Sequence, residues 1–434
     1  MTLPDIRLNL SVIILAGNET GKLEALLSKV QAALIPLSIS HEMIVVNNWP
    51  DEGTHQMVRD HRARQLSTLS DGYGAALLMG FHHAAGEYTI VMDTDQTDSA
   101  SFLCTLWDAR STADIVIASR YIQGGQARMP ILRVALSKLL NAVFSRGLDL
   151  QVRDMSCGFR LYKTDIVRGL FAECKDYDIL QEILVKALME GYRIREIPFT
   201  YHARSNLSAY ARVVKFGLAY WKTFARLWRL RNSIASADYD ARAYNALLPP
   251  QRYWQRQRYK HITRLIHGRG RCLDVGCGSS RIIETLPPTS VALDILIRKL
   301  RFARLYGVST VQGSLFDLPI RTQSFPCVIC SQVIEHIPQA NAFNELDRVL
   351  QPGGLLILGT PDYAKWQWRV IEWLYKLLLP QAYADEHITH YTYHDLCEEF
   401  VNRRGYGLDA VRYIMQGELI LGFRKPPSRD ASGQ

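Results

Sequence analysis

Two carboxylates stand two positions apart directly after a short apolar run. Residues 88–99 read YTIVMDTDQTDS, so Asp93 and Asp95 follow the run at 88–92. That run has the length and the β-branched content of a buried strand. Carboxylates at the carboxyl end of a strand suit a hard divalent cation that is shared with substrate phosphates. An Asp-x-Asp can equally be a solvated turn, so the surrounding sequence must decide between a metal site and a turn.

The stretches around this pair alternate between strand and helix patterns. Apolar runs at residues 10–15, 42–46 and 114–119 predict three further buried strands. Gly72 and Gly74 mark the start of a helical pattern, and Gly86 marks its end before the strand that carries Asp93. This alternation predicts a doubly wound α/β layer with the carboxylates at one sheet edge.

Seven segments in unbroken order over about the first 210 residues carry a family resemblance. They are ILAGNE, VVNNWPDEGT, DGYGAALLMGF, IVMDTD, ASRYIQGG, RDMSCGFRLYK and EIPFTYHARSNLS. As a set they resemble family 2 glycosyltransferases of the dolichol-phosphate mannose synthase-like branch. The resemblance implies a GT-A nucleotide-binding α/β domain over residues 1–208 that transfers a sugar from a nucleotide-sugar donor.

The same resemblance implies roles for individual residues. Asp93 and Asp95 are expected to bind a divalent metal, Mg²⁺ or Mn²⁺, which would stabilise the charge that develops on the donor diphosphate. The residues expected near the nucleotide-sugar are Asn18, Glu19, Asn47, Arg120 and Arg160. Two positions depart from the family pattern: Asn47 and Asn48 replace a usual pair of aspartates, and Thr97 replaces a frequent glutamine.

A general base is needed only for some acceptors. A sugar hydroxyl must lose a proton, whereas a lipid phosphate is already ionised. Asp154 is the first candidate for such a base and Glu182 is the second. Either carboxylate could instead be the structural partner of a nearby arginine.

Length and charge limit the classes of protein. A chain of 434 residues with 48% hydrophobic residues suggests two or three domains. The net charge of +9 is concentrated in residues 204–260, where twelve Lys or Arg face two Asp, a surplus of ten. The rest is nearly neutral, so nucleic acid is not an expected partner. No apolar run could span a bilayer, and Asp5 and Arg7 argue against a signal peptide, so we expect a cytoplasmic protein.

Residues 209–262 are predicted to connect two domains. The first part is a helical pattern with basic residues at one face, namely Arg212, Lys215, Lys222, Arg226 and Arg229, opposite Val213, Gly217, Trp221, Phe224 and Trp228. This pattern is typical of a helix that lies on an anionic membrane surface or near a polyprenyl-phosphate lipid. The alternative is a helix packed on the enzyme with a solvated basic side. Residues 233–260, with Pro249 and Pro250, are predicted to form a linker and the lead-in helix of the second domain.

The last part of the chain begins with a predicted strand that is followed by a glycine-rich turn. The segment RCLDVGCGSSR contains Gly276 and Gly278, and Asp294 follows Asp274 by twenty residues, the distance expected of a ribose ligand. Together with GSLFDLPIRTQSFPCVICSQVIEHI and RVLQPGGLLIL, it resembles class I S-adenosylmethionine-dependent methyltransferases. The resemblance implies a Rossmann-like domain at residues 263–434.

By that resemblance the cofactor contacts can be assigned. Asp274, Gly276 and Gly278 are expected at the methionine end of S-adenosylmethionine, and Asp294 at the ribose. Phe316 and Asp317 are expected at the adenine. A hydroxyl acceptor would also need a base, for which His336, His387 and His390 are candidates. No metal-ligand spacing stands out in this half.

The sequence therefore predicts a peripheral membrane enzyme with glycosyltransferase and methyltransferase activities. The main alternative is an active methyltransferase whose GT-A half only binds nucleotide-sugar or lipid, which Asn47 and Asn48 favour. A nucleotidyltransferase would share the metal carboxylates but would not explain the segments GFRLYK and ARSNLS.

Overall fold

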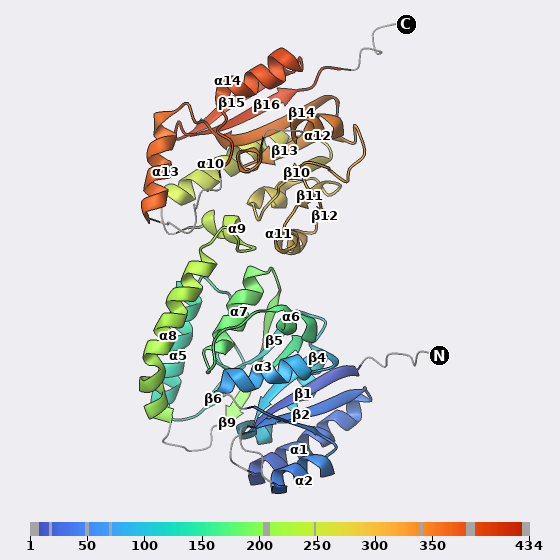
Figure 1. Ribbon diagram of the computed structural model, residues 1–434, viewed down its shortest axis with the longest axis vertical. Coiled ribbons are helices and arrows are strands. Elements are labelled where there is room, and N and C mark those ends of the chain that lie inside the picture. Colours follow the sequence, from blue (N-terminus) through green and yellow to red (C-terminus); the bar gives the residue numbers. More distant parts are fainter. Residues whose placement is uncertain are drawn as a thin grey trace, which may run out of the picture. The chain divides into compact units, whose positions relative to one another are not determined.

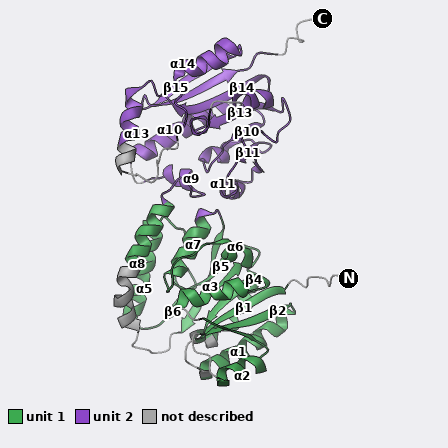
Figure 2. Cartoon of the chain, in the orientation of Figure 1, with its two compact units in different colours: residues 1–188, 192–231 green, residues 189–191, 232–434 purple. Residues whose placement is uncertain are grey.

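The computed structural model describes residues 8–16, 20–47, 52–68, 72–202, 209–246, 249–338, 342–378 and 387–427. Its contacts divide the chain into two compact units, which Figure 2 shows in different colours. Unit 1 comprises residues 1–188 and 192–231, and unit 2 comprises residues 189–191 and 232–434. Each unit contains a seven-stranded sheet, and the predicted α/β class is confirmed for both.

Unit 1 is built on a sheet in the order β3-β2-β1-β4-β7-β5-β8. Its strands are β1 (Leu8–Ala16), β2 (His41–Asn47), β3 (Arg64–Ser67), β4 (Gly86–Asp93), β5 (Ile115–Ser119), β7 (Arg160–Lys163) and β8 (Ile194–Pro198). β7 runs antiparallel to its neighbours, and the other pairs are parallel. The four predicted strands fall in this sheet, because parallel strands that are covered on both faces have continuous apolar runs.

Helices lie on both sides of this sheet (Figure 1), with α1 and α2 on one side and α3 on the other. They are α1 (Thr20–Leu34), α2 (Glu52–Asp60), α3 (Tyr73–His83), α4 (Phe102–Asp108), α5 (Ile131–Gly147), α6 (Thr164–Gly169), α7 (Ile179–Met189) and α8 (Ala209–Arg231). Short elements complete the unit: the helices η1 (Ile35–Leu37) and η2 (Thr94–Ser99), and a ribbon of β6 (Gln126–Arg128) with β9 (Thr200–His202).

Unit 2 has the strand order β12-β11-β10-β13-β14-β16-β15, with β16 antiparallel to both of its neighbours. Its strands are β10 (Cys272–Val275), β11 (Val291–Asp294), β12 (Ser309–Gln312), β13 (Phe325–Ser331), β14 (Leu350–Pro361), β15 (Gly407–Ile414) and β16 (Glu418–Arg424). Its helices are α9 (Tyr239–Ala243), α10 (Pro249–Ile266), η3 (Arg281–Thr285), α11 (Ile297–Ala303), η4 (Arg304–Tyr306), η5 (Ile334–His336), α12 (Ala342–Val349), α13 (Trp366–Leu378), α14 (Tyr393–Cys397) and η6 (Glu398–Arg403).

The segment predicted to connect the domains is divided between the two units. α8 belongs to unit 1, whereas α9 and α10 belong to unit 2. α10 packs through Trp254, Ile262 and Ile266 into the core that β14 and β16 also line. α10 occupies the stretch where the sequence predicts a lead-in helix, and its three packed side chains lie among many charged and polar ones.

The apolar face predicted for α8 is packed against the enzyme only in part. Leu227 is fully buried, and the ring of Phe224 lies 5.3 Å from that of Phe144 in α5. Trp221 and Trp228, predicted beside Phe224, are 64% and 41% exposed. Trp221 and Trp228 therefore lie next to the packed face of α8 and are not part of it.

The basic side of α8 is also not wholly solvated. Arg226 pairs with Glu173 and Glu182, while Lys222 and Arg229 are exposed. The predicted side chains at 212, 213, 215 and 217 lie outside the described residues. Within the described ranges, no helix has both the length and the hydropathy that crossing a bilayer requires.

Candidate active sites

The carboxyl edge of the unit 1 sheet holds Asp93 in a fixed position. Asp93 ends β4 and caps η2: its carboxylate accepts a hydrogen bond from the backbone N–H of Gln96, and the Gln96 side chain accepts one from the Asp93 N–H at 3.2 Å. This reciprocal capping orients the carboxylate at the strand end. The backbone of Asp95 lies in the same turn. The side chains of Asp95 and Thr97 lie outside the described residues.

A buried phenol lies close to this carboxylate. The hydroxyl of Tyr73, at the start of α3, is buried and has no hydrogen-bond partner among the described residues. Burial first, and the charge of Asp93 second, raise the pKa of Tyr73 well above its usual value. A Cβ added at Gly158 would lie 2.5 Å from the Tyr73 hydroxyl and 3.4 Å from Asp93 Oδ2. Three segments therefore converge at the end of β4, and only a glycine fits between them.

Asn47 lies at the same sheet edge, across β1 from Asp93. The register pairs Asn47 with Ala16, and Asp93 with Leu15. The Asn47 side chain is buried, and its Oδ1 accepts a hydrogen bond from Gln65 Nε2 at 3.1 Å. Asn18, Glu19 and Asn48 lie outside the described residues. Asn18, Glu19 and Asn47 are predicted near the nucleotide-sugar, and of these three the structure describes Asn47.

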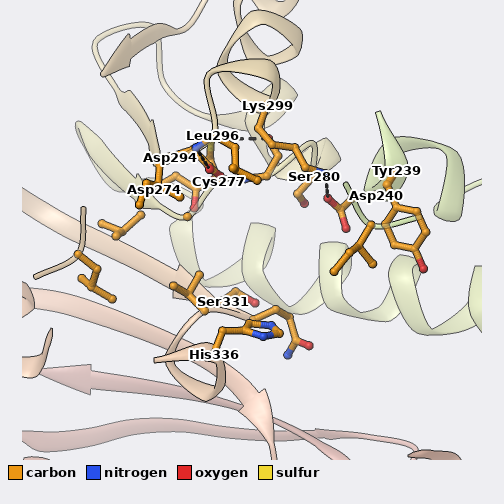
Figure 3. A pocket seen from close by; sticks show the side chains of 18 of the residues that line it. Tyr239, Asp240, Asp274, Cys277, Ser280, Asp294, Leu296, Lys299, Ser331 and His336 are labelled. Atoms are coloured by element: carbon orange, nitrogen blue, oxygen red, sulfur yellow. Dashed lines mark hydrogen bonds and ion pairs between the residues drawn. The ribbon is translucent and has the colours of Figure 1, made fainter. Parts of the chain in front are cut away.

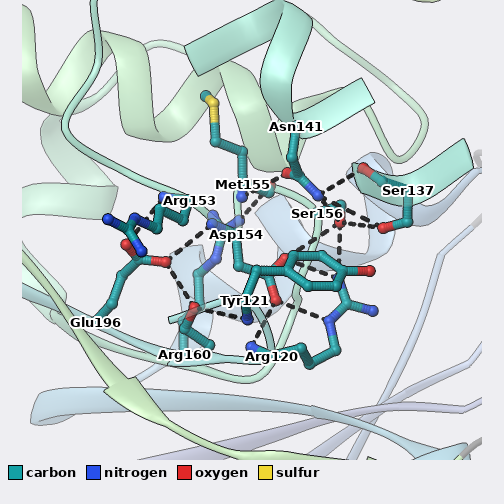
Figure 4. Close-up of polar contacts among 11 residues, drawn as sticks. Arg120, Tyr121, Ser137, Asn141, Arg153, Asp154, Met155, Ser156, Arg160 and Glu196 are labelled. Atoms are coloured by element: carbon teal, nitrogen blue, oxygen red, sulfur yellow. Dashed lines mark hydrogen bonds and ion pairs between the residues drawn. The ribbon is translucent and has the colours of Figure 1, made fainter. Parts of the chain in front are cut away.

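Arg120 and Asp154 form a buried ion pair within unit 1 (Figure 4). The guanidinium donates from Nε to Oδ2 and from Nη2 to Oδ1 of Asp154, both at 2.7 Å. The backbone N–H of Arg120 donates to Oδ2 at 2.9 Å, and Nη2 also donates to Ser156 Oγ at 2.7 Å. Such bidentate, charge-assisted bonds fix both partners, and they join the end of β5 to the segment RDMSCGFR.

This geometry favours the structural role that the sequence left open for Asp154. Burial would raise the pKa of Asp154, but the charge and hydrogen bonds of Arg120 outweigh it and lower that pKa below its usual value. A carboxylate with a lowered pKa is a poor proton acceptor near neutral pH. Both oxygens also contact the guanidinium of Arg120, whose side chain is only 10% exposed.

We expect Asp154→Asn to lower the free energy of unfolding by roughly 3–5 kcal/mol, because it leaves a buried guanidinium without its counter-ion. The folded-state pKa is lowered, so the stabilisation is present above the unfolded pKa of about 4. It is lost as the pH falls through the folded pKa. Denaturant unfolding at pH 7 and at pH 3 should show a gap to wild type that narrows at pH 3. Asp108→Asn, at an exposed position, is the matched control; equal stability of Asp154→Asn and wild type would refute the assignment.

Arg160 is buried beneath the site and does not reach its surface. Its side chain has no exposed area. Nη2 donates to the backbone carbonyl of Met155 at 2.7 Å, and Nη1 donates to that of Leu180 at 2.9 Å. Arg160, which is predicted near the nucleotide-sugar, therefore ties the segment after Asp154 to α7 and has no exposed side-chain area.

Glu182 is likewise held by structural partners. Its carboxylate accepts the backbone N–H groups of Glu173 and Cys174 at 3.0 and 2.8 Å. It also pairs with Lys186 at 2.8 Å and with Arg226 of α8 at 3.1 Å. Burial opposes ionisation, but these bonds lower the pKa of Glu182. The geometry favours the structural alternative here too.

Unit 2 contains a cavity of about 700 Å³ at the carboxyl ends of β10, β11 and β13 (Figure 3). The predicted residues that line it are Asp274, Gly276, Gly278, Asp294, Phe316 and His336. The lining ends at Phe316 in this segment and does not include Asp317. His387 lines the cavity, and His390 does not, as its ring stacks on Tyr363 at 4.1 Å.

The glycine-rich turn after β10 has the backbone that only glycine adopts easily. Gly276 and Gly278 have φ of +67° and +54°. A Cβ at Gly276 would collide with Cγ2 of Val333, and one at Gly278 would lie 3.0 Å from Asp240 Oδ2. The Gly278 N–H donates to Asp294 Oδ2 at 3.0 Å. The turn therefore forms a close-fitting cradle beside the Asp294 carboxylate.

Asp274 lies beneath this turn. It is 4% exposed, and burial together with the negative charge of Asp294 raises the pKa of Asp274 to about 7. Two carboxylates that face one cavity favour a ligand with positive charge.

Hydrogen bonds that the sequence did not predict hold the other side of the glycine-rich turn. Asp240 in α9 accepts hydrogen bonds from the N–H and Oγ of Ser279 at 3.2 and 3.0 Å. Lys299 Nζ lies 3.5 Å from Asp240 Oδ2 and donates to the carbonyl of Ser236 at 2.9 Å. Asp240 and Lys299 both line the cavity. Asp240 lies in the predicted linker, and the sequence singles it out as one of two acidic residues among twelve basic ones in residues 204–260.

Comparisons with known proteins support both halves. The family model described as glycosyl transferase family 2 matches residues 11–171, and the model described as methyltransferase domain matches residues 273–358. A dolichol-phosphate mannosyltransferase of Pyrococcus furiosus is 28% identical over 209 residues, which cover 46% of this chain and 58% of the relative. The chain thus spans little more than half of that relative's length.

Two further proteins extend these similarities. A polyprenol monophosphomannose synthase of Mycolicibacterium smegmatis is 28% identical over 245 residues, 51% of this chain and 90% of the relative. A solved Thermotoga maritima structure, described as a SAM-dependent methyltransferase and possible histamine N-methyltransferase, covers 40% of this chain and 91% of its own at 17% identity and a TM-score of 0.33. The family models identify an N-terminal family 2 glycosyltransferase domain followed by a methyltransferase domain, and each unit contains a seven-stranded α/β sheet.

Proposed function

We propose that the chain is a bifunctional enzyme. Its first domain would transfer a sugar from a nucleotide-sugar to a polyprenyl phosphate, and its second would methylate a sugar or lipid related to that product. The observation that carries the first activity is Asp93, capped at the end of β4 beside a buried phenol without a hydrogen-bond partner. A carboxylate and an unsatisfied hydroxyl at the carboxyl edge of an α/β sheet fit the phosphate and metal end of a donor.

The chain's own residues would bind and orient the donor. Asp93, with Asp95 beside it in η2, would hold a divalent ion, which supplies positive charge against the leaving diphosphate. Asn47 would lie beside the nucleotide without adding charge. In the transfer the bond from sugar C1 to the diphosphate breaks and a bond to an acceptor oxygen forms.

The two candidate bases are already paired with cationic side chains, which supports a phosphate acceptor. Asp154 and Glu182 have lowered pKa values and cationic partners. An ionised lipid phosphate attacks without losing a proton, whereas a sugar hydroxyl would need a free base. The names of the two relatives, which refer to dolichol phosphate and to polyprenol, agree with this choice.

Exposed apolar side chains on two helices support contact with a membrane face. On α5 they are Ile131, Leu132, Leu139 and Val143, at 89%, 55%, 62% and 42% exposure. Trp221 and Trp228 protrude from α8, which packs beside α5 through Phe144. Exposed Lys138, Lys222 and Arg229 add positive charge. An apolar surface with basic neighbours suits an anionic lipid interface.

We expect the protein to sediment with anionic vesicles at low salt and to be released as the salt concentration rises. Replacing both Trp221 and Trp228 by glutamate should weaken binding roughly tenfold or more, since it removes apolar contact and adds negative charge. Ile35→Glu is the control, because Ile35 is also an exposed apolar residue of unit 1, at 76% exposure. Failure to bind at low salt, or equal loss in the control, would rule out this surface.

In the second domain, S-adenosylmethionine fits the cavity chemistry. The cradle at Gly276 and Gly278 admits a ligand close to the backbone, and Asp294, which lines the same cavity, would bind the ribose hydroxyls. The buried Asp274 would face positive charge on the cofactor. In methyl transfer the carbon–sulfur bond breaks and its electron pair stays on sulfur, while the acceptor forms a new bond to the methyl carbon; the domain mainly supplies alignment.

The raised pKa of Asp274 predicts a pH-dependent affinity. Its folded pKa of about 7 lies above the unfolded value, so ionising it costs stability as the pH rises from about 4 to 7. A cationic ligand favours the ionised form, so binding should be roughly tenfold tighter at pH 8 than at pH 6. Calorimetry at both values tests this, with Asp274→Asn expected to remove the dependence. A wild-type affinity that is flat between pH 6 and 8 would contradict it.

The alternative, a first domain that only binds nucleotide-sugar or lipid, is favoured by the uncharged Asn47. A panel of radiolabelled nucleotide-sugars, incubated with the protein, Mn²⁺ and vesicles containing polyprenyl phosphate, separates the two. Our proposal predicts that one donor labels the lipid. Donor binding without transfer or hydrolysis would favour the alternative.

A further inference from the structure

One carboxylate and two imidazoles meet at the cavity of unit 2. Glu335, His336 and His387 each bring a potential metal-ligand atom within 4.8 Å of the other two. Glu335 and His336 lie in η5, just after β13, whereas His387 comes from the segment after α13. Because Glu335 and His336 are adjacent and His387 lies 51 residues further along the chain, the sequence shows no usual metal-ligand spacing.

The cluster opens toward the cofactor cavity. His336 and His387 line it, and Figure 3 shows His336 across the cavity from Asp294 and the glycine-rich turn. A ligand bound at the cluster would therefore share the cavity with S-adenosylmethionine.

Glu335 lacks a partner for one of its oxygens. The residue is fully buried, and one carboxylate oxygen, Oε2, accepts a hydrogen bond from Thr360 Oγ1 at 3.2 Å. The other, Oε1, is buried and has no hydrogen-bond partner among the described residues. Leaving a buried carboxylate oxygen unsatisfied is costly, and a cation between it and the imidazoles would remove that cost.

The three side chains are held in place before any ligand arrives. The N–H groups of Ile388 and Thr389 donate to the backbone carbonyl of Glu335 at 2.8 and 3.0 Å, which fastens the His387 segment to η5. The Tyr363 hydroxyl lies 2.5 Å from His387 Nδ1. Histidine ligands of metals are commonly oriented by such a bond at the second ring nitrogen.

We propose that Glu335, His336 and His387 bind a divalent first-row transition metal ion that holds an oxygen of the methyl acceptor beside S-adenosylmethionine. Two imidazoles with one carboxylate are a known ligand set for such ions and leave coordination positions open for a substrate. The acceptor class would be a hydroxyl compound. The proposal rests on the methyltransferase function of unit 2, and it makes His336 a ligand and not the base that the sequence suggested, because a bound imidazole nitrogen cannot take up a proton.

Mn²⁺ binding followed by electron paramagnetic resonance tests the site. The background is the full chain with Asp93→Asn and Asp95→Asn, which removes the other expected metal site. This protein should bind one Mn²⁺ and show magnetic coupling to imidazole nitrogen. Glu335→Gln and His387→Gln should each raise the dissociation constant roughly 10- to 100-fold and abolish that coupling. His394→Gln, at an exposed histidine in α14, should change neither.

Calorimetry with S-adenosylmethionine on every variant separates the possible failures. If the cofactor binds but no Mn²⁺ with nitrogen coupling is found, the metal site is overturned and the methyltransferase function stands. If Glu335→Gln and His387→Gln keep wild-type Mn²⁺ affinity, the ligand assignment is overturned. If neither ligand binds to the background protein, and wild type also fails to bind S-adenosylmethionine, the methyltransferase proposal itself fails.

Discussion

Asp93→Asn is expected to reduce sugar transfer by roughly 10³-fold, or about 4 kcal/mol of transition-state stabilisation. The substitution keeps the shape of the side chain and its ability to cap η2, but it removes the charge that would hold the metal against the leaving diphosphate. Initial rates with the active donor, measured at saturating Mn²⁺, give the effect. Raising the metal concentration should restore little of the rate.

The matched control is Asp98→Asn in the same short helix. Asp98 is exposed and pairs with Lys29 at 3.0 Å, so its loss should leave transfer nearly unchanged. Affinity for S-adenosylmethionine should be equal in both variants, because that site belongs to unit 2. An Asp93→Asn protein that transfers sugar at the wild-type rate would exclude Asp93 from the metal site.

Gly276→Ala is expected to abolish measurable S-adenosylmethionine binding and to destabilise unit 2 by roughly 1–3 kcal/mol. The position combines a φ of +67° with a collision between the added Cβ and Cγ2 of Val333. The turn must shift to relieve that collision, and the shift would move the backbone against which the cofactor fits. Calorimetry for binding and denaturant unfolding for stability measure the two effects.

Gly268→Ala isolates the steric part of this effect. Gly268 has a φ of +71°, and nothing lies within 4 Å of an added Cβ. It should therefore show backbone strain alone, about 1 kcal/mol, with cofactor affinity unchanged. Similar affinities for the two variants would mean that the turn does not contact the cofactor.

The elements that position both sites follow from local sequence. β1 and β4 are continuous apolar runs because parallel strands are covered on both faces, and Asp93 follows directly at the end of one such run. The glycine-rich turn and Asp294 could be predicted in the same way, from a strand, two glycines and a fixed spacing.

Partners that are distant in the sequence could not be predicted. Asp154 was recognisable as a candidate base or an arginine partner, and only the structure shows Arg120 engaging both of its oxygens. Asp240 lies in a stretch with the composition of a linker, yet it locks the turn through Ser279. Side-chain pairing across long separations depends on tertiary packing, and local periodicity carries no trace of it.

The exposure of α8 illustrates a second limit. Its basic and aromatic residues do segregate by helical spacing, but the packed face is set by what α5 and α7 offer. The ring of Phe224 packs against that of Phe144, and Arg226 forms ion pairs with Glu173 and Glu182. The spacing of a helix gives its faces, while its neighbours decide which face is buried.

A double-label experiment tests the central claim most directly. The protein is incubated with vesicles containing polyprenyl phosphate, Mn²⁺, a ³H-labelled nucleotide-sugar from the donor panel and S-adenosylmethionine carrying a ¹⁴C methyl group. We expect both labels in one lipid-extractable product. Asp93→Asn should remove the sugar label, and Gly276→Ala should remove only the methyl label. Absence of sugar label in lipid with every donor, from a protein that still binds S-adenosylmethionine, would contradict the central claim.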